Sequence, residues 1–372
     1  MVDHLRPVCA EIDLGNLIHN YDYLCGFPVP SRICAVVKAD AYGHGSVEVA
    51  RALYERGCRD FAVALVEEGV ELRRAGVDGE ILVLSQPPLD ALAIAARHDI
   101  TVTAYTKDAI KFISDTPEEE RPNFQLKVDT GMYRVGAALD ELSALSEVIG
   151  RGEIDGLWSH FAVADEVSNE STEFTKLQLS RFQSAINTLK GAGIIPRQLH
   201  IANSSGLLYY PESRLTKSRV GLALYGYAPR YEVDELGLRP VMSLISEVSF
   251  VKTVEAGERP SYGRLRPMAY RGKVVTVPIG YADGVPRSLF NGGGEVIIKG
   301  HRYPFAGVIT MDQVLIDVGE EGNIEIGDRV TLIGGDGREN IGADEWARRC
   351  STITWEILCG ISKRVPRIYL ER

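Results

Sequence analysis

The sequence predicts an α/β fold in which an N-terminal (β/α)8 barrel precedes a C-terminal, mostly β domain. Short apolar runs alternate with longer amphipathic stretches through roughly the first two thirds of the chain. Eight such apolar runs occur, which is the number of parallel strands that closes a barrel. Beyond Leu238 the long amphipathic stretches disappear, and glycine-rich turns separate short strand-like runs.

Each candidate strand of the barrel has an apolar centre and ends in polar or glycine-rich residues, as expected for parallel strands that are covered on both faces. The strands are Ile33–Lys38, Phe61–Leu65, Ile81–Leu84, Ile100–Thr103, Phe124–Asp129, Asp155–His160, Gln198–Ala202 and Arg219–Leu224. A doubly wound open sheet is the alternative, because periodicity alone does not show closure. No Gly-x-Gly-x-x-Gly follows the first strand, which favours the barrel.

Amphipathic stretches between these strands predict helices, and the second domain has its own strands and two short helices. The barrel helices are Ser46–Arg56, Glu67–Ala75, Leu139–Gly150 and Ser171–Lys190. The later strands are Val241–Val251, Lys273–Pro278, Glu295–Lys299, Val314–Val318 and Asp328–Ile333, and the helices lie around Ala343–Cys350 and Thr354–Ser362. We therefore expect two domains, residues 1–238 and 239–372.

Composition excludes several classes of protein. The 372 residues are 45% hydrophobic and 25% charged, which excludes a disordered chain, a collagen-like fibre and a disulfide-stapled miniprotein. The net charge of −10 and the lack of a basic run argue against nucleic acid, and an anionic ligand needs a local positive site. No apolar run of 18 residues and no signal peptide is present, so we expect no membrane association. Six scattered cysteines without a Cys-x-x-Cys pair predict reduced thiols, a cytoplasmic location and no metal site.

Polar residues collect at the predicted C-terminal ends of the barrel strands, where catalytic groups of barrel enzymes gather. Lys38 ends the first strand, and a partly buried lysine has the lowered pKa that Schiff-base chemistry needs. An ion pair with Asp40 is the structural alternative. The other polar residues at these ends are Lys127, Asp129, Arg134, Ser159, His160, Asn203, Ser204 and Arg219. His160 as a core histidine and Asn203-Ser204 as a helix cap are the ordinary interpretations.

The loops after the last two strands are a frequent phosphate site in barrels. Ser204 and Gly221-Leu222 lie there. A lysine suited to a Schiff base together with a phosphate site indicates pyridoxal 5′-phosphate. In the second domain, Tyr262 and Tyr281 stand in glycine-flanked turns, as packing residues or as proton-transfer groups.

These residues give the chain a resemblance to the alanine racemase family, pyridoxal-phosphate enzymes with a barrel and a C-terminal β domain. The resemblance covers essentially the whole chain. Its motifs are Ala35–Gly45, Asp129–Arg134, Ser159–Phe161, Asn203-Ser204, Arg219–Gly221, Ser261–Gly263, Gly280–Gly284 and Met311–Gln313.

The resemblance assigns the cofactor contacts to residues of this chain. It implies that Lys38 forms the Schiff base and that Arg219 faces the pyridine nitrogen, keeping it unprotonated because a guanidinium only donates. The phosphate would be held by Tyr42, Ser204, Gly221 and Leu222. His160, Asn203 and Trp355 complete the expected cofactor contacts.

The resemblance also implies a homodimer, because in this family the β domain completes the partner's site. Tyr262, Met311 and Tyr281 would come from the partner, supported by Asp312. Lys38 and Tyr262 would exchange protons on opposite faces of the substrate, with Lys38 serving D-alanine and Tyr262 L-alanine. Arg134 would bind the substrate carboxylate, oriented by a carbamylated Lys127, although a pair between Lys127 and Asp129 is the simpler arrangement.

The expected reaction is the interconversion of L-alanine and D-alanine, which supplies D-alanine for peptidoglycan. Trp355 stands where the family usually has tyrosine, and Val308 where it often has arginine, so a serine or broad-specificity racemase is the alternative. A pyridoxal-phosphate decarboxylase and a non-catalytic cofactor-binding protein are the rival classes. Tyr262 argues against the first of these, and the β domain argues against the second.

Overall fold

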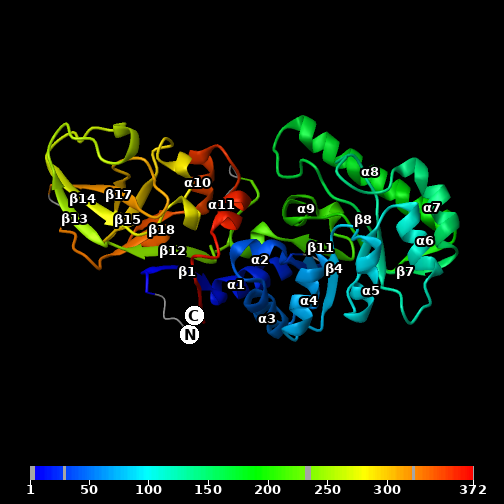
Figure 1. The fold of residues 1–372 in the computed structure, drawn as a ribbon. Coiled ribbons are helices and arrows are strands. Elements are labelled where there is room, and N and C mark those ends of the chain that lie inside the picture. Colours follow the sequence, from blue (N-terminus) through cyan, green and yellow to red (C-terminus); the bar gives the residue numbers. More distant parts are fainter. Residues whose placement is uncertain (1–4, 28–30, 231–235, 321–322, 372) are drawn as a thin grey trace. The chain divides into compact units, whose positions relative to one another are not determined.

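A computed structural model describes residues 5–27, 31–230, 236–320 and 323–371, which form two compact units (Figure 1). The barrel unit contains the described residues of Leu17–Ala41 and Ser46–Arg239. The β unit contains the described residues up to Asn16, the segment Tyr42–Gly45, and those from Pro240 onward. The β unit thus takes two segments from the N-terminal part of the chain in addition to the residues from Pro240 onward.

Among the described residues, eight parallel strands form the barrel, and all except β4 are shorter than the runs that predicted them. They are β2 (Arg32–Val36), β3 (Asp60–Val63), β4 (Glu80–Val83), β5 (Val102–Ala104), β6 (Phe124–Lys127), β8 (Gly156–Trp158), β10 (Leu199–His200) and β11 (Lys217–Val220). They pair in the orders β11-β2-β3-β4 and β10-β8-β6-β5. The Thr101 N–H bonds the Ile81 carbonyl at 2.9 Å, and the Arg219 N–H bonds the Ala202 carbonyl at 3.0 Å. These bonds join the two groups of strands, so the barrel closes and the open sheet is excluded.

Helices follow most of the barrel strands, and α3 has the bounds that the sequence predicts. The helices are α1 (Leu14–Cys25), α3 (Ser46–Arg56), α4 (Val66–Arg74), α5 (Leu89–Arg97), α6 (Lys107–Asp115), α7 (Leu142–Ile149), α8 (Asn169–Gly191) and α9 (Ser204–Tyr209). The Thr106 and Ser168 side chains cap α6 and α8 by accepting a main-chain N–H three residues on. The remaining strands of this unit, β7 (Gly152–Ile154) and β9 (Ile194–Pro196), form a separate parallel pair.

The β unit contains a seven-stranded and a three-stranded sheet, ordered β16-β15-β18-β12-β1-β20 with β19 beside β18, and β13-β14-β17. Its strands are β1 (Val8–Asp13), β12 (Met242–Glu247), β13 (Phe250–Val254), β14 (Gly272–Val277), β15 (Glu295–Ile298), β16 (His301–Pro304), β17 (Val314–Gly319), β18 (Arg329–Asp336), β19 (Glu339–Ile341) and β20 (Arg367–Leu370). Its helices are α10 (Ala343–Cys350) and α11 (Thr354–Gly360). In Figure 1 the blue β1 lies beside the green β12.

The single strand predicted at Val241–Val251 is wrong, because the chain changes sheets within it. The Val248 N–H bonds the Asp328 carbonyl at 2.9 Å, whereas the Ser249 N–H bonds the Thr276 carbonyl at 2.8 Å. The residues before this point pair with β1 and β18, and those after it pair with β14.

Candidate active site

Lys38 directly follows β2 and opens an unusual turn. The helical segment α2 (Lys38–Gly43) is left-handed, since the four residues from Ala39 to Tyr42 have φ values between 52° and 55°. A non-glycine residue in this conformation costs roughly 1–2 kcal/mol, so the surrounding structure must hold the turn in place.

Two carboxylates hold the start of this turn. Glu68 accepts the Ala39 N–H at 2.7 Å through one oxygen, and through the other it accepts the N–H groups of Ala64 and Leu65. Asp40 accepts the Ser46 N–H at 2.8 Å, where α3 begins. The starts of α4 and α3 thus fix the backbone that carries Lys38.

Four cationic side chains act on His160, which follows β8. Burial and these cations hold the pKa of His160 well below its usual value, so the ring is neutral at physiological pH. In decreasing order of effect the cations are Arg219, Arg134, Lys127 and Lys38. A chain with a net charge of −10 therefore concentrates positive charge at one end of its barrel, as an anionic ligand requires.

Arg219 lies inside the barrel, only 3% exposed. Its Nη1 donates to Nδ1 of His200 at 2.5 Å, and its Nη2 donates to the Ser159 carbonyl at 2.7 Å and to Nδ1 of His160 at 3.1 Å. Burial lowers the pKa of Arg219 to about 10, which leaves the guanidinium charged at neutral pH. Among the described residues its Nε–H has no acceptor, so this donor is available to a ligand.

Lys127, the last residue of β6, is also 3% exposed. Its Nζ lies 4.3 Å from the ring centroid of Trp158. Burial, followed by the charges of Arg219 and Arg134, lowers the pKa of Lys127 to about 7, against the opposing effect of Asp129. One oxygen of Asp129 accepts the three N–H groups from Gly131 to Tyr133 instead. A neutral amine is therefore accessible to Lys127 near neutral pH.

The loops after β10 and β11 lie in contact. Asn203 caps α9 by accepting the Gly206 N–H at 2.9 Å. The next residue, Ser204, accepts the Gly221 N–H on its hydroxyl at 3.2 Å. Leu222 opens a 3-10 helix, where main-chain N–H groups lack an acceptor within the helix. This brings together the three barrel residues that the sequence assigns to phosphate.

Tyr42 and Trp355 both belong to the β unit. Tyr42 is buried, and burial raises the pKa of its phenol. The segment that follows packs against α11, because a side chain at Gly43 would place its Cβ 2.5 Å from the Leu358 carbonyl oxygen. Trp355 is a half-buried residue of the same helix. The segment after Tyr42 and the helix of Trp355 thus pack together.

Tyr262 is 74% exposed and lies on a loop of constrained shape. Ser261 has a φ of 68°, and its hydroxyl donates to the Val308 carbonyl at 2.6 Å. Val308 itself is buried, so it anchors this loop through its main chain. The structure therefore presents the phenol outward from a fixed base.

Tyr281 and Met311, 43% and 53% exposed, stand on two loops that are bonded to each other. The Tyr281 N–H bonds the Thr310 carbonyl at 3.0 Å. Ion pairs brace the same loops, since the buried Asp283 takes a bidentate bond from Arg6 at 2.7 and 2.9 Å. Arg364 pairs with Asp312 at 2.7 Å and with Asp283 at 3.5 Å, so Asp312 supports these loops from their surface.

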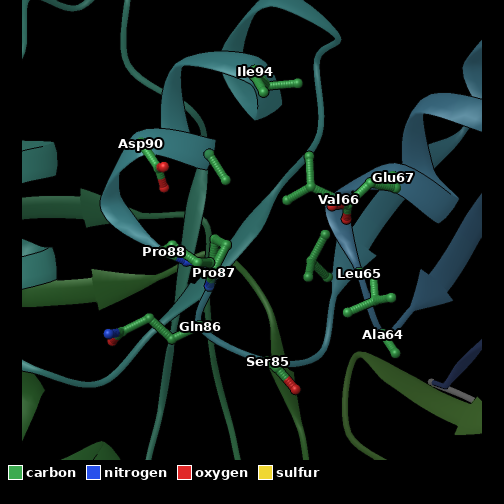
Figure 2. A pocket seen from close by; sticks show the side chains of 12 residues that line it. Ala64, Leu65, Val66, Glu67, Ser85, Gln86, Pro87, Pro88, Asp90 and Ile94 are labelled. Atoms are coloured by element: carbon green, nitrogen blue, oxygen red, sulfur yellow. The ribbon is translucent and has the colours of Figure 1, made fainter.

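A cavity of about 460 Å³ also opens near the ends of β3 and β4, between the starts of α4 and α5 (Figure 2). Its described lining includes Leu65, Pro87, Pro88 and Ile94, and none of its residues is cationic. None of the predicted site residues lines it. Its apolar walls do not suit a phosphate group.

Sequence reasoning missed two contributors to this site, Glu68 and His200. The carboxylate of Glu68 holds the turn after Lys38, although an acidic residue near the start of a helix ordinarily signals only a favourable interaction with the helix dipole. His200 accepts from Arg219, but no motif marks a histidine within a short strand as inward-facing before the barrel closes.

Two absences hold for the described part of the chain. No helix there has both the length and the apolar character needed to span a bilayer. In those same residues, no group of three or more His, Cys, Asp or Glu side chains is placed to hold a metal ion.

Family models match both parts of the chain. The model described as the alanine racemase N-terminal domain matches residues 12–229, and that of the alanine racemase C-terminal domain matches residues 241–369. The alanine racemase of Clostridium tetani is 39% identical over 379 residues, covering 100% of this chain and 97% of that protein. The alanine racemase of Methanococcus maripaludis is 39% identical and covers 100% of both chains.

Similarity to solved structures supports the same family assignment. The crystal structure of alanine racemase from Bacillus anthracis with bound L-Ala-P matches with a TM-score of 0.91 and 34% identity, over 100% of this chain and 96% of that chain. Alanine racemase from the D-cycloserine producer Streptomyces lavendulae matches with a TM-score of 0.89 and 36% identity, over 100% and 98%.

Proposed function

The chain belongs to the alanine racemase family, and we propose that it interconverts L-alanine and D-alanine with pyridoxal 5′-phosphate bound at the C-terminal end of its barrel. The observation that carries the proposal is the cluster of four cations around a neutral His160, beside the Ser204–Gly221 contact. The curated relatives are named alanine racemases, which does not favour the serine alternative.

The barrel residues fit this cofactor. The Nε–H of Arg219 is a donor without an acceptor among the described residues. It lies at the end of the barrel where the positive charges gather, and these charges attract anions. It suits an aromatic nitrogen that accepts a hydrogen bond and carries no proton. The Ser204 hydroxyl and the main-chain N–H of Leu222 suit a phosphate. Tyr42, His160, Asn203 and Trp355 are proposed as further contacts.

Two of the chain's groups would move the substrate's Cα proton. When bound, pyridoxal phosphate supplies the electron withdrawal that acidifies this proton. Lys38 precedes a backbone turn that Glu68 and Asp40 fix, so the direction in which its side chain leaves the backbone is set. Tyr262 offers a phenol from the other unit. Removing the Cα proton on one face of the substrate and returning a proton on the opposite face inverts the configuration at Cα. Arg134 would hold the substrate carboxylate during this exchange.

The cofactor assignment has a direct test. Purified protein loaded with pyridoxal phosphate should show a yellow band near ~420 nm, because the Lys38 amine combines with the cofactor aldehyde. Borohydride should then attach the label irreversibly to the peptide that contains Lys38. Lys38→Ala should lose both the band and the label, and Lys111→Ala, a surface variant, should keep them. A wild-type protein that takes up no pyridoxal phosphate would contradict the proposed function.

We propose a homodimer in which each β unit serves the partner's barrel. Tyr262, Tyr281 and Met311 are all exposed, and rigid loops hold them. Exposed residues on rigid loops suit a site that another chain completes, with Met311 against the substrate.

Mixing two inactive variants tests this arrangement. Lys38→Ala and Tyr262→Phe protomers should regain about a quarter of wild-type activity after equal mixing, because half the dimers are mixed and each mixed dimer contains one intact site. Subunit exchange is checked with differently tagged chains. Exchange without recovery would mean that one chain supplies both residues to the same site.

The cellular role belongs to the same proposal. The product D-alanine is a building block of peptidoglycan, and we place the enzyme in the cytoplasm. Six scattered cysteines without a Cys-x-x-Cys pair support a reducing compartment.

A further inference from the structure

A chain of side-chain hydrogen bonds runs inside the barrel from Arg219 to Glu80, at the opposite end of the strands. Arg219 Nη1 and His200 Nδ1 are 2.5 Å apart, and His200 Nε2 and Gln125 Oε1 are 2.6 Å apart. Gln125 Nε2 then donates to Glu80 at 2.8 Å. His200 and Gln125 are both fully buried, so no water competes for these groups.

Elementary hydrogen-bond chemistry assigns every proton along this chain. A guanidinium has donors only, so Nδ1 of His200 must be the acceptor and carry no hydrogen. Burial and the charges of Arg219 and Lys217 hold the pKa of His200 well below its usual value, so the ring is neutral and its hydrogen is on Nε2. Gln125 must therefore present its oxygen to the ring, which turns its amide nitrogen toward Glu80.

The Glu80 end of this row of hydrogen bonds fixes the orientation of the Gln125 amide. Glu80 also accepts from Gln198 at 2.7 Å and pairs with Lys217 at 3.1 Å. A carboxylate only accepts, so it does not tolerate the oxygen of Gln125 in place of the nitrogen. Gly156 leaves room for this side chain, since a Cβ there would lie 2.9 Å from Gln125 Cδ.

We propose that Gln125, oriented by Glu80, is a positioning residue that anchors the Nε2–H of His200, fixes the orientation of that ring and thereby holds Arg219 in place for the cofactor. The other tautomer would direct an N–H at the guanidinium, and the two donors would repel. Hydrogen bonds in such a row also strengthen one another, with a cation at one end and an anion at the other. The effect on catalysis rests on the proposed function, whereas the tautomer does not.

Nitrogen-15 spectra of the imidazoles in the cofactor-loaded enzyme read the tautomer directly. The chain has 7 histidines, and the His200 signals are the ones that His200→Gln removes. In the wild type, the His200 hydrogen should be on Nε2. Gln125→Met leaves the Nε2–H without an acceptor, so the Nε2 signal of His200 should shift and broaden as the ring loses its fixed orientation. Gln198→Met is the matched control, because it removes a neighbouring donor to Glu80 but does not contact His200, and it should keep the wild-type spectrum.

Kinetics give the second readout. Gln125→Met should lower kcat for L-alanine about tenfold with a smaller change in KM, because Arg219 loses its fixed position but the substrate contacts stay. Gln198→Met makes the same exchange of side chain at the neighbouring glutamine and should keep kcat, which separates loss of the acceptor for His200 from a general packing defect. Hydrogen on Nδ1 in the wild type, or unchanged His200 signals in Gln125→Met, would overturn the inference. A wild-type protein with the expected tautomer but no racemase activity would contradict the proposed function alone.

Discussion

Tyr262→Phe should slow the exchange of the Cα proton of L-alanine on the order of 10³-fold, while exchange from D-alanine stays within about tenfold of the wild type. The asymmetry follows from the two-base proposal. Without its phenol, Tyr262 no longer accepts the proton of the L-enantiomer, but Lys38 still faces the proton of the D-enantiomer. Neither enantiomer should be converted to the other at an appreciable rate, since conversion needs both groups.

The measurement is deuterium incorporation at Cα, followed separately for each enantiomer in heavy water. Tyr270→Phe is the matched control, because Tyr270 is another exposed tyrosine of the β unit and lies outside the proposed site. That variant should exchange both enantiomers at the wild-type rate. Equal losses for the two enantiomers in Tyr262→Phe would contradict the assignment of faces.

The sequence was most informative where parallel strands end. Lys38, Lys127 and Arg219 stand at or near the ends of short apolar runs, and in any closed barrel such positions meet at one rim. The structure places all three in one electrostatic cluster, as their influence on His160 shows. Position in a strand is therefore enough to predict that these three side chains lie near one another, because the topology of the barrel brings strand ends together.

Structural features that depend on residues far away in the sequence could not be predicted from local sequence patterns. Strand β1 pairs with β12 and β20, more than 200 residues away in the sequence, so local pattern gave no reason to place it in the second unit. The left-handed turn after Lys38 consists mainly of residues that rarely adopt that conformation alone. Glu68 holds it from outside, and Asp40, within it, bonds to the start of α3. Such a turn can be recognised only when the side chains that hold it in place are known.

The interior of the barrel shows the same limit. Gln125 and His200 belong to strands that are neighbours of β8 but not of each other, and they meet only because their side chains point inward. Inward orientation is set by closure and register rather than by residue type. A glutamine and a histidine in two short strands therefore carry no signal before the barrel is assembled.

Lys127→Ala should lower kcat/KM for both enantiomers on the order of 10²-fold, because the substrate-binding Arg134 loses the group that orients it. We propose that this group is a carbamate. The neutral Lys127 amine adds to the carbon of carbon dioxide and releases a proton, which gives an anionic carboxylate on Nζ. An unmodified, protonated Lys127 would repel Arg134, whereas the carbamate would accept its hydrogen bonds.

The pH dependence follows from the lowered pKa of Lys127, about 7. Only the neutral amine reacts, so the carbamate should form at and above neutral pH and be lost as the pH falls below 7. Enzyme stripped of carbon dioxide at low pH and returned to neutral buffer should therefore stay impaired until bicarbonate is added. Carbon-13 spectra with labelled bicarbonate should show the carbamate signal in the wild type and in Lys111→Ala, and not in Lys127→Ala.

Chemical rescue separates the missing carboxylate from a folding defect. Acetate or chloride should partly restore Lys127→Ala, because a small anion can occupy the space of the lost group beside Arg134. The same additions should leave Lys111→Ala unchanged, since Lys111 is an exposed residue that pairs with Asp115. Full activity of Lys127→Ala without any added anion, or a wild-type enzyme that binds no labelled carbon, would remove the carbamate and leave Arg134 to be oriented by the Asp129 loop alone.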